Sequence, residues 1–250
     1  MSGHSKWSTI KRKKEKTDSA RGRVFTKLIK ELTVAARHGG GDAESNPRLR
    51  TALLAAKAGN MPADNIKKAI QRGTGELPGV NYEEVQYEAY GPRGVAILMQ
   101  ALTDNRNRTV SELRFVLSKN GGNMGEAGCV NWMFHKRGLI EVESDRAPED
   151  LVLEIALDAG ATDMTTGGGV YAIVAPLESF ETVKAALEQK RIPVASAEIT
   201  MVPQSSVKLD GKDAEQMLRL LEALEEHEDI QQVYANFDID DAIIERYSAA

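Results

Sequence analysis

The spacing of apolar residues changes at residues 73–80, and this change separates two parts of the chain that need different folds. Before it, apolar side chains recur every three or four residues, which predicts three helices, over 24–36, from Asn46-Pro47 and from Met61-Pro62 to Gly73. After it, the alternating residues 85–89 and the apolar run 95–102 are typical of strands. The stretch between the two parts contains glycines and a proline, the composition of a linker.

The order of predicted elements after residue 82 is ββα, then βαβαβ, then βαβ, which fits the split βαβ pattern of ferredoxin-like modules. We therefore expect an α+β fold of three domains, an N-terminal helical domain followed by two ferredoxin-like α+β domains. The expected boundaries are a flexible basic arm at 1–20, a helical nucleic-acid-binding domain at 21–75, a discontinuous α+β domain at 80–130 plus 203–250, and an inserted α+β domain at 131–202. Two contiguous domains cut near residue 145 are the alternative.

Local patterns give two further expectations in this part of the chain. Thr109-Val110-Ser111-Glu112 has the spacing of a capping box and predicts a helix that begins there. Residues 130–134 and 139–142 are interpreted as two strands that form one hairpin.

Charge is distributed unevenly along the chain. Residues 1–72 carry 17 Lys and Arg against 6 Asp and Glu, whereas residues 141–250 carry 8 against 24. The basic end predicts a polyanionic partner, and the acidic end would repel the same partner and so orient the molecule on it. No apolar run approaches the roughly 18 residues of a membrane span, and no secretory signal follows the basic start. With a single cysteine, Cys129, the expected location is the cytoplasm and no membrane partner is expected.

The basic arm supplies most of the candidate binding residues. The cations of the arm and of the start of the helical domain would neutralise phosphates: Lys11, Arg12, Lys13, Lys14, Lys16, Arg21, Arg23 and Lys27. Trp7 has two interpretations, a stacking group for a base or a hydrophobic peg against the protein itself.

Asp104-Asn105-Arg106-Asn107-Arg108-Thr109 is the second candidate site, because it runs from a strand into the start of a helix. Arg106 and Arg108 at a helix N-terminus suit phosphate or sugar oxygens. The alternative is a loop in which Asp and Asn side chains cap the backbone while the arginines pair with nearby acids.

The sequence gives little support for a catalytic, metal-binding or phosphate-loop site. The glycine runs Gly39-Gly40-Gly41, Gly121-Gly122 and Gly167-Gly168-Gly169 lack the spacing of phosphate loops and are interpreted as turns and helix C-caps. No histidine pair has zinc-ligand spacing, and Cys129 and His135 stand too far apart on an extended strand to form a dyad. We expect no catalytic residue, no metal, no cofactor and no small-molecule substrate.

Short motifs throughout the chain resemble one family, and the match keeps their order. They are Gly3-His4-Ser5-Lys6-Trp7, Phe25-Thr26-Lys27, Gly39-Gly40-Gly41-Asp42, Asn46-Pro47-Arg48-Leu49-Arg50, Asn60-Met61-Pro62, Tyr90-Gly91-Pro92, the run 104–109 and Gly121-Gly122-Asn123-Met124-Gly125. The chain resembles the YebC family of bacterial proteins, which includes the mitochondrial translational activator of cytochrome oxidase subunit one. Arg93 and Cys129 stand where small residues are usual in that family.

The resemblance implies three domains around a cleft, in a cytoplasmic protein without catalytic activity. It also implies a role in gene expression, either as a DNA-binding transcriptional regulator or as a factor that associates with ribosomal RNA and helps the ribosome through proline-rich stretches. His4, Lys6 and Trp7 would then contact nucleic acid. A monomer is expected. The alternatives from other classes are an enzyme acting on a phosphorylated small molecule in the interdomain cleft, and a scaffold that binds a basic protein through the acidic half.

Overall fold

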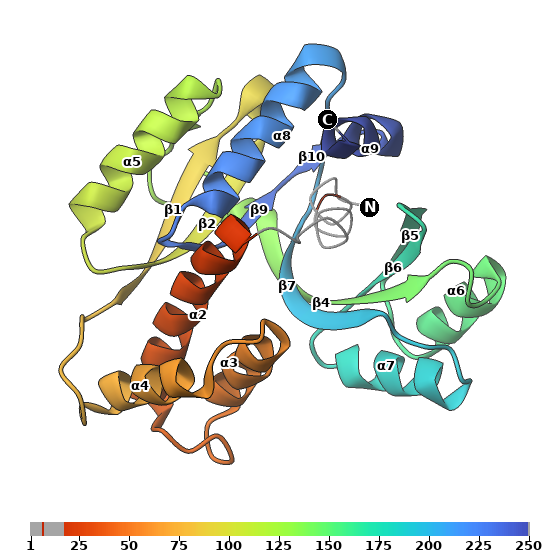
Figure 1. Ribbon diagram of the computed structural model, residues 1–250. Helices are drawn as coiled ribbons and strands as arrows, with labels where there is room; N and C mark the ends of the chain where they lie inside the picture. Colours follow the sequence, from red (N-terminus) through yellow and green to blue (C-terminus); the bar gives the residue numbers. More distant parts are fainter. Residues whose placement is uncertain (1–6, 8–17, 250) are drawn as a thin grey trace.

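The computed structural model describes Trp7 and residues 18–249, and its α+β architecture agrees with the fold class expected from the sequence (Figure 1). A helical part comes first, and two four-stranded antiparallel sheets with their helices follow. Each part has a buried apolar cluster of its own.

The helical part packs two short helices against one long helix. The elements are α2 (Asp18–Gly39), α3 (Pro47–Ala58) and α4 (Ala63–Thr74). Asn46 caps α3 as expected, since its side chain accepts a hydrogen bond from Leu49 N at 3.1 Å and its amide donates to Ala35 O at 2.8 Å. Gly73 lets α4 approach α2, because a Cβ there would lie 2.4 Å from Thr33 O.

The first sheet has the order β3-β1-β2-β9 and draws its strands from both ends of the α+β part. Its strands are β1 (Glu83–Tyr90), β2 (Ala96–Thr103), β3 (Asn123–Met124) and β9 (Ile230–Ala235). The short 3-10 helix η1 (Pro92–Gly94) turns β1 into β2. One face is covered by α5 (Arg106–Lys119) and α8 (Gly211–Glu226), and α9 (Asp241–Ala249) packs on α8. A small parallel pair, β8 (Val207–Lys208) with β10 (Phe237–Asp238), lies beside it.

The second sheet lies between those segments in the sequence and has the order β5-β6-β4-β7. Its elements are β4 (Phe134–Glu143), α6 (Glu149–Asp158), β5 (Asp163–Gly167), β6 (Val170–Ala175), α7 (Phe180–Gln189) and β7 (Ser196–Pro203). This is the strand order of a split βαβ module. The first sheet instead opens with the β1–β2 hairpin, so the two sheets differ in connectivity. Gly168 and Gly169, both at positive φ, form the tight turn from β5 to β6, as the turn interpretation of that glycine run expected.

Two local predictions were wrong. Helix α5 begins at Arg106 with Asn105 as its N-cap, so Thr109 is not a capping residue but lies inside the helix, where its hydroxyl bonds to Asp229. The predicted hairpin of residues 130–142 is one continuous strand, β4, preceded by the short 3-10 helix η2 (Asn131–Met133). Gly138 lies in the middle of β4, where glycine permits the close approach of α7, because a Cβ there would come within 2.2 Å of the Phe180 ring.

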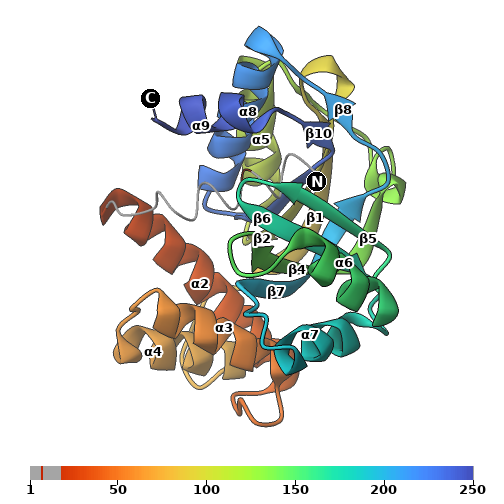
Figure 2. The ribbon, with the colours of Figure 1, turned by 90° about the vertical axis from the view of Figure 1, so that its right-hand side faces the viewer.

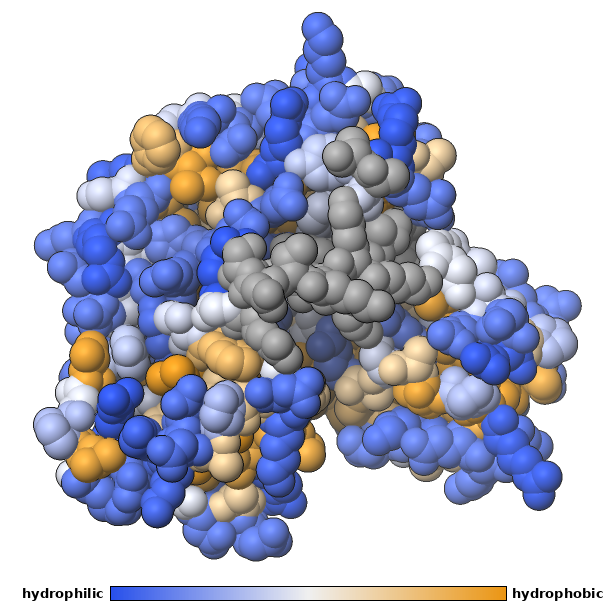
Figure 3. Space-filling view, in the orientation of Figure 1, coloured by the Kyte–Doolittle hydropathy of each residue, from blue (hydrophilic) through white to orange (hydrophobic). Residues whose placement is uncertain are grey.

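The parts surround an open cleft. Figure 1 shows α3 and α4 on one side and α6 and α7 on the other, and Figure 3 shows the surface hollowed between these two lobes. In Figure 2, turned by 90°, α2 runs down one edge of the molecule from the level of α8 to α3 and α4.

Candidate nucleic-acid interface

A buried carboxylate joins the helical part to the first sheet. Asp229 lies between α8 and β9 with 2 % of its surface exposed, and it accepts hydrogen bonds from Lys30 Nζ at 2.5 Å, Thr109 Oγ1 at 2.7 Å and Arg108 Nη2 at 3.0 Å. Burial alone would raise the pKa of Asp229, but the hydrogen bonds from Lys30, Thr109 and Arg108 outweigh it and lower this pKa to about 2. We call these four residues the Asp229 cluster.

The run 104–109 is therefore part of an internal junction. Arg108 also pairs with Asp104 at 2.8 Å, and Asn105 accepts a hydrogen bond from the Arg108 backbone N–H at 3.1 Å. Arg106 pairs with Glu83 at 2.6 Å. In this structure both arginines pair with acids and the asparagine caps the helix, which is the second of the two arrangements that the sequence left open.

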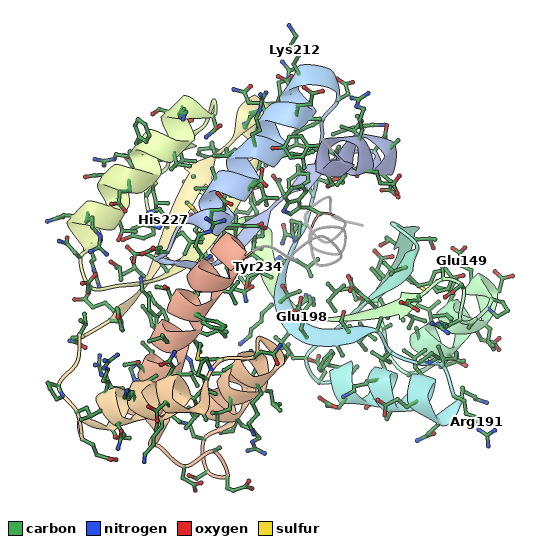
Figure 4. The ribbon with its side chains drawn as sticks, in the orientation of Figure 1. Glu149, Arg191, Glu198, Lys212, His227 and Tyr234 are labelled. Carbon is green, nitrogen blue, oxygen red and sulfur yellow. The ribbon has the colours of Figure 1, made fainter. Side chains whose placement is uncertain are left out.

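Two further candidate residues hold α2 against the acidic end of α8. Arg23 pairs with Glu226 at 2.7 Å, and Lys27 Nζ donates to Glu225 O at 2.5 Å. The last carbonyls of a helix carry partial negative charge, so cations are favourable there. Figure 4 shows His227 at this end of α8, beside the start of α2.

Trp7 lies on the same end of α8. It is 3 % exposed, its Nε1 donates to Glu225 Oε2 at 3.1 Å, and its ring centroid lies 6.0 Å from that of Tyr247. This placement corresponds to the peg rather than to an exposed stacking group. The other candidates in the arm, His4, Lys6, Lys11, Arg12, Lys13, Lys14 and Lys16, lie outside the described residues, as does the side chain of Arg21.

The helices α3 and α4 carry exposed cations that the list of candidate residues omitted. Residues 47–74 contain six Lys and Arg against one acid, Asp64. Lys57 and Lys67 line a shallow hollow between the two helices, and among the described residues neither forms an ion pair. Arg50 and Lys68 are also exposed, and Lys68 pairs with Asp64 at 3.3 Å. We call Arg50, Lys57, Lys67 and Lys68 the α3–α4 basic surface.

The signal for this surface was present in the sequence. On the second and third predicted helices, these cations lie at positions outside the apolar stripe. They are therefore expected to point outward, to solvent. The dense lysine run of the arm, by contrast, did not indicate which cations of the helices would pair with acids of the chain and which would stay exposed.

A second hollow lies between the helical part and the face of the first sheet opposite α5 and α8. Arg48 stands on one side and bonds to Glu31 at 2.7 Å and Glu84 at 2.7 Å, and these bonds raise the pKa of its guanidinium. The amides of Gln86 and Gln100 lie on the sheet side of the hollow. Its walls combine these polar side chains with Val85, Ala101 and Leu102, and Arg48 already pairs with the two acids.

One group of side chains has metal-ligand geometry. Glu112, His227 and Asp229 bring ligand atoms within 4.8 Å of one another. However, Asp229 is saturated by the Asp229 cluster, and His227 Nδ1 accepts the Asp229 backbone N–H at 3.1 Å while its Nε2 faces Glu112 Oε2 at 3.0 Å. A cation would have to displace these bonds, so we assign the group to the junction.

Comparison with known proteins gives a consistent match over the chain. Residues 5–76 match the family model described as the TACO1/YebC protein N-terminal domain, and residues 82–237 match the TACO1/YebC second and third domain. A probable transcriptional regulatory protein of Geobacter sulfurreducens is 59 % identical over 239 residues, covering 96 % of both chains. One of Desulforapulum autotrophicum is 55 % identical over 243 residues, covering 97 % of this chain and 98 % of its own.

A solved structure is also similar. The crystal structure of a conserved hypothetical protein from Aquifex aeolicus, 48 % identical, covers 90 % of this chain and 93 % of its own with a TM-score of 0.75. Within the described residues, no helix is both long enough and apolar enough to cross a membrane.

Proposed function

The chain belongs to the TACO1/YebC family, and we propose that it regulates gene expression by binding nucleic acid without catalysing a reaction. Curated relatives over half identical to it are named probable transcriptional regulatory proteins, which supports a regulatory role. The nucleic-acid contact and its target are our inference from the charge and geometry of this chain.

The observation that carries the proposal is the α3–α4 basic surface. Arg23, Lys27 and Lys30 are engaged at the junction with α8, whereas Lys57 and Lys67 form no ion pair among the described residues and border one hollow. One acid, Glu76, also lines this hollow, so the cations outnumber the acids there. Exposed cations in excess attract phosphates and release counterions on binding. The arm, with its further lysines, would extend this contact along the backbone of the nucleic acid.

The arrangement of the cations suits binding of folded RNA better than recognition of duplex DNA. A duplex-reading helix enters the major groove, often as one of a symmetric pair. Here the cations belong to two short helices that form one side of an open cleft, a shape suited to a folded RNA whose single strands and backbone can follow the surface. We therefore propose ribosomal or other structured RNA as the target, with DNA as the competing possibility.

The described carboxyl groups give no support for acid–base chemistry. Where their pKa values are displaced, at Asp42, Glu88 and Asp229, the direction is downward because each accepts hydrogen bonds. A general acid working near neutral pH needs the opposite displacement. In addition, Glu31 and Glu84, the acids beside the polar hollow, are paired with Arg48.

A competition experiment tests the target. Labelled duplex DNA is held on the full chain at about 0.15 M salt, where exposed charges are partly screened, and ribosomes are titrated in at matched phosphate concentration. We expect ribosomes to displace the DNA far below equal phosphate, since a specific RNA surface offers more than charge. Displacement only in proportion to phosphate would remove the support for a ribosomal target, and failure of both polyanions to bind would contradict the nucleic-acid proposal itself.

A further inference from the structure

An exposed tryptophan stands on the segment that joins the two sheets. Trp132 lies in η2, and 64 % of its surface is exposed. Its neighbours Val130 and Phe134 are buried, and they pack with Leu98 and Tyr234 on the face of the first sheet opposite α5 and α8. Val130 and Phe134 thus anchor the segment in the core. Trp132, its largest apolar residue, is not buried there, so core packing does not explain its presence.

A buried carboxylate fixes the backbone of this segment. Glu88 of β1 is 7 % exposed and accepts three backbone N–H bonds, from Gly128 at 2.6 Å, Val130 at 2.6 Å and Asn131 at 2.8 Å. Burial opposes ionisation, but these bonds prevail and lower the pKa of Glu88. The residue before Trp132 is therefore held by an ionised group at neutral pH.

The indole itself is also oriented. Trp132 Nε1 donates to Cys129 O at 3.2 Å, which satisfies the polar atom of the ring inside the loop. An aromatic group whose direction is set in advance loses little conformational entropy when it makes a contact. The loop is thus built to present the apolar surface of the ring to solvent.

Polar side chains lie along the segment that carries Trp132 and on the strand beside it. Asn131 Oδ1 accepts a hydrogen bond from Gln86 Nε2 at 3.0 Å, and Gln86 also lines the hollow whose opposite side carries Arg48 of α3. Lys136, four residues beyond Trp132, is exposed and forms no ion pair within the described part of the chain. Amides can bond the edges of bases, and a cation suits the phosphate that accompanies them.

We propose that Trp132 stacks on an unpaired base of the nucleic acid that the α3–α4 basic surface holds. The inference rests on the proposed function and adds a second, sequence-tolerant contact to it. A base inside a duplex already stacks on both faces, so the ligand class is a single-stranded segment, such as a loop of folded RNA. A protein-binding hot spot is less well supported, because such sites are surrounded by closely packed apolar contacts, whereas the residue before Trp132 is Asn131, which bonds to a second amide, Gln86.

The test compares single-residue variants of the full chain for binding of a labelled single-stranded RNA of about 12 nucleotides, a length that spans a typical single-strand site. Trp132→Ala should weaken binding about tenfold or more, the usual effect of losing one stacking aromatic, and Trp132→Phe should weaken it less. Phe115→Ala is the matched control, since Phe115 of α5 is 67 % exposed and lies outside this loop. Thermal unfolding of each variant establishes that the chain is folded.

Tryptophan fluorescence gives a direct readout. The emission of Trp132, obtained as the difference between the native chain and Trp132→Phe, should be quenched by the RNA and not by inorganic polyphosphate, which supplies charge without bases. If RNA binds but leaves both this emission and the Trp132→Ala affinity unchanged, stacking is overturned while the proposed function stands. If the RNA fails to bind, the proposed function fails as well. Shielding of Trp132 by ribosomal proteins alone, without RNA, would overturn stacking in favour of a protein contact.

Discussion

Arg108 shows why a residue type does not by itself identify a binding site. An arginine beside a helix N-terminus is equally suited to a phosphate and to a carboxylate of the same chain. The decision depends on Asp229, which lies 121 residues further along and reaches Arg108 only through the fold. Because the sequence contains no local sign of that contact, it left both arrangements open.

At the residue scale, the Asp229 cluster predicts a specific dependence of stability on pH. The pKa of Asp229 is lowered to about 2 in the folded chain, so its contribution to the free energy of unfolding is present at neutral pH and is lost as pH falls below about 4. Replacing one partner of a buried ion pair is costly because the other charge stays buried. We therefore expect Asp229→Asn to destabilise the chain by about 3 kcal/mol at pH 7.

Urea unfolding at neutral pH and near pH 3 measures this effect. The difference in the free energy of unfolding between the unsubstituted chain and Asp229→Asn should shrink at the lower pH. The Asp229 carboxylate is then partly protonated when the chain is unfolded, so folding gains less from its ionised form. Asp64→Asn is the control, since the Asp64 side chain is 80 % exposed and its pairing with Lys68 contributes little. Equal costs for the two variants would contradict the assigned role of Asp229.

At the element scale, the sequence predicted the helices and strands whose capping residues or apolar spacing are local in the chain. Asn46-Pro47 is a cap and a first-turn proline, and α3 begins there. The apolar run 95–102 falls on β2, one residue out of step at each end. The hairpin predicted from residues 130–134 and 139–142 was wrong, because Gly138 permits a close approach of Phe180 within one strand, and that contact leaves no local sign in the sequence. The exposed loop of Trp132 was missed for a similar reason, since the Glu88 carboxylate that organises it lies two strands earlier.

The contact between α2 and α4 gives a prediction at this scale. Gly73→Ala would place a methyl group 2.4 Å from Thr33 O and 2.7 Å from Ala36 Cβ, so the helices must separate. We expect a loss of about 1 to 3 kcal/mol in the free energy of unfolding, the usual cost of overpacking. Gly22→Ala is the matched control in α2, because no described atom beyond its chain neighbours and the backbone of its own helix lies within 4 Å of the added Cβ, and a gain of about 0.5 to 1 kcal/mol is expected.

Urea unfolding of the full-length variants measures both changes. If Gly73→Ala proved as stable as Gly22→Ala, close packing of α4 on α2 would not be what requires glycine at residue 73.

At the scale of the whole molecule, the uneven charge of the chain has two separate uses. Part of the basic end makes contacts within the chain. Arg23, Lys27 and Lys30 bind the acidic end of α8 and the loop after it. This contact gives some of the C-terminal acids a structural role and fixes the helical part beside the first sheet. The cations of the α3–α4 basic surface are exposed instead, and they belong to the lobe on one side of the cleft seen in Figure 3.

The salt dependence of RNA affinity tests the central claim most directly. We predict that log affinity falls steeply with log salt for the native chain, and that reversing two cations, Lys57→Glu with Lys67→Glu, weakens binding and makes the slope shallower by roughly 1 to 2, as expected for two lost phosphate contacts. Lys212→Glu, at the far end of α8 in Figure 4, should leave the slope unchanged. An unchanged slope in the doubly reversed variant would contradict the account, because the α3–α4 basic surface would then not be where the nucleic acid binds.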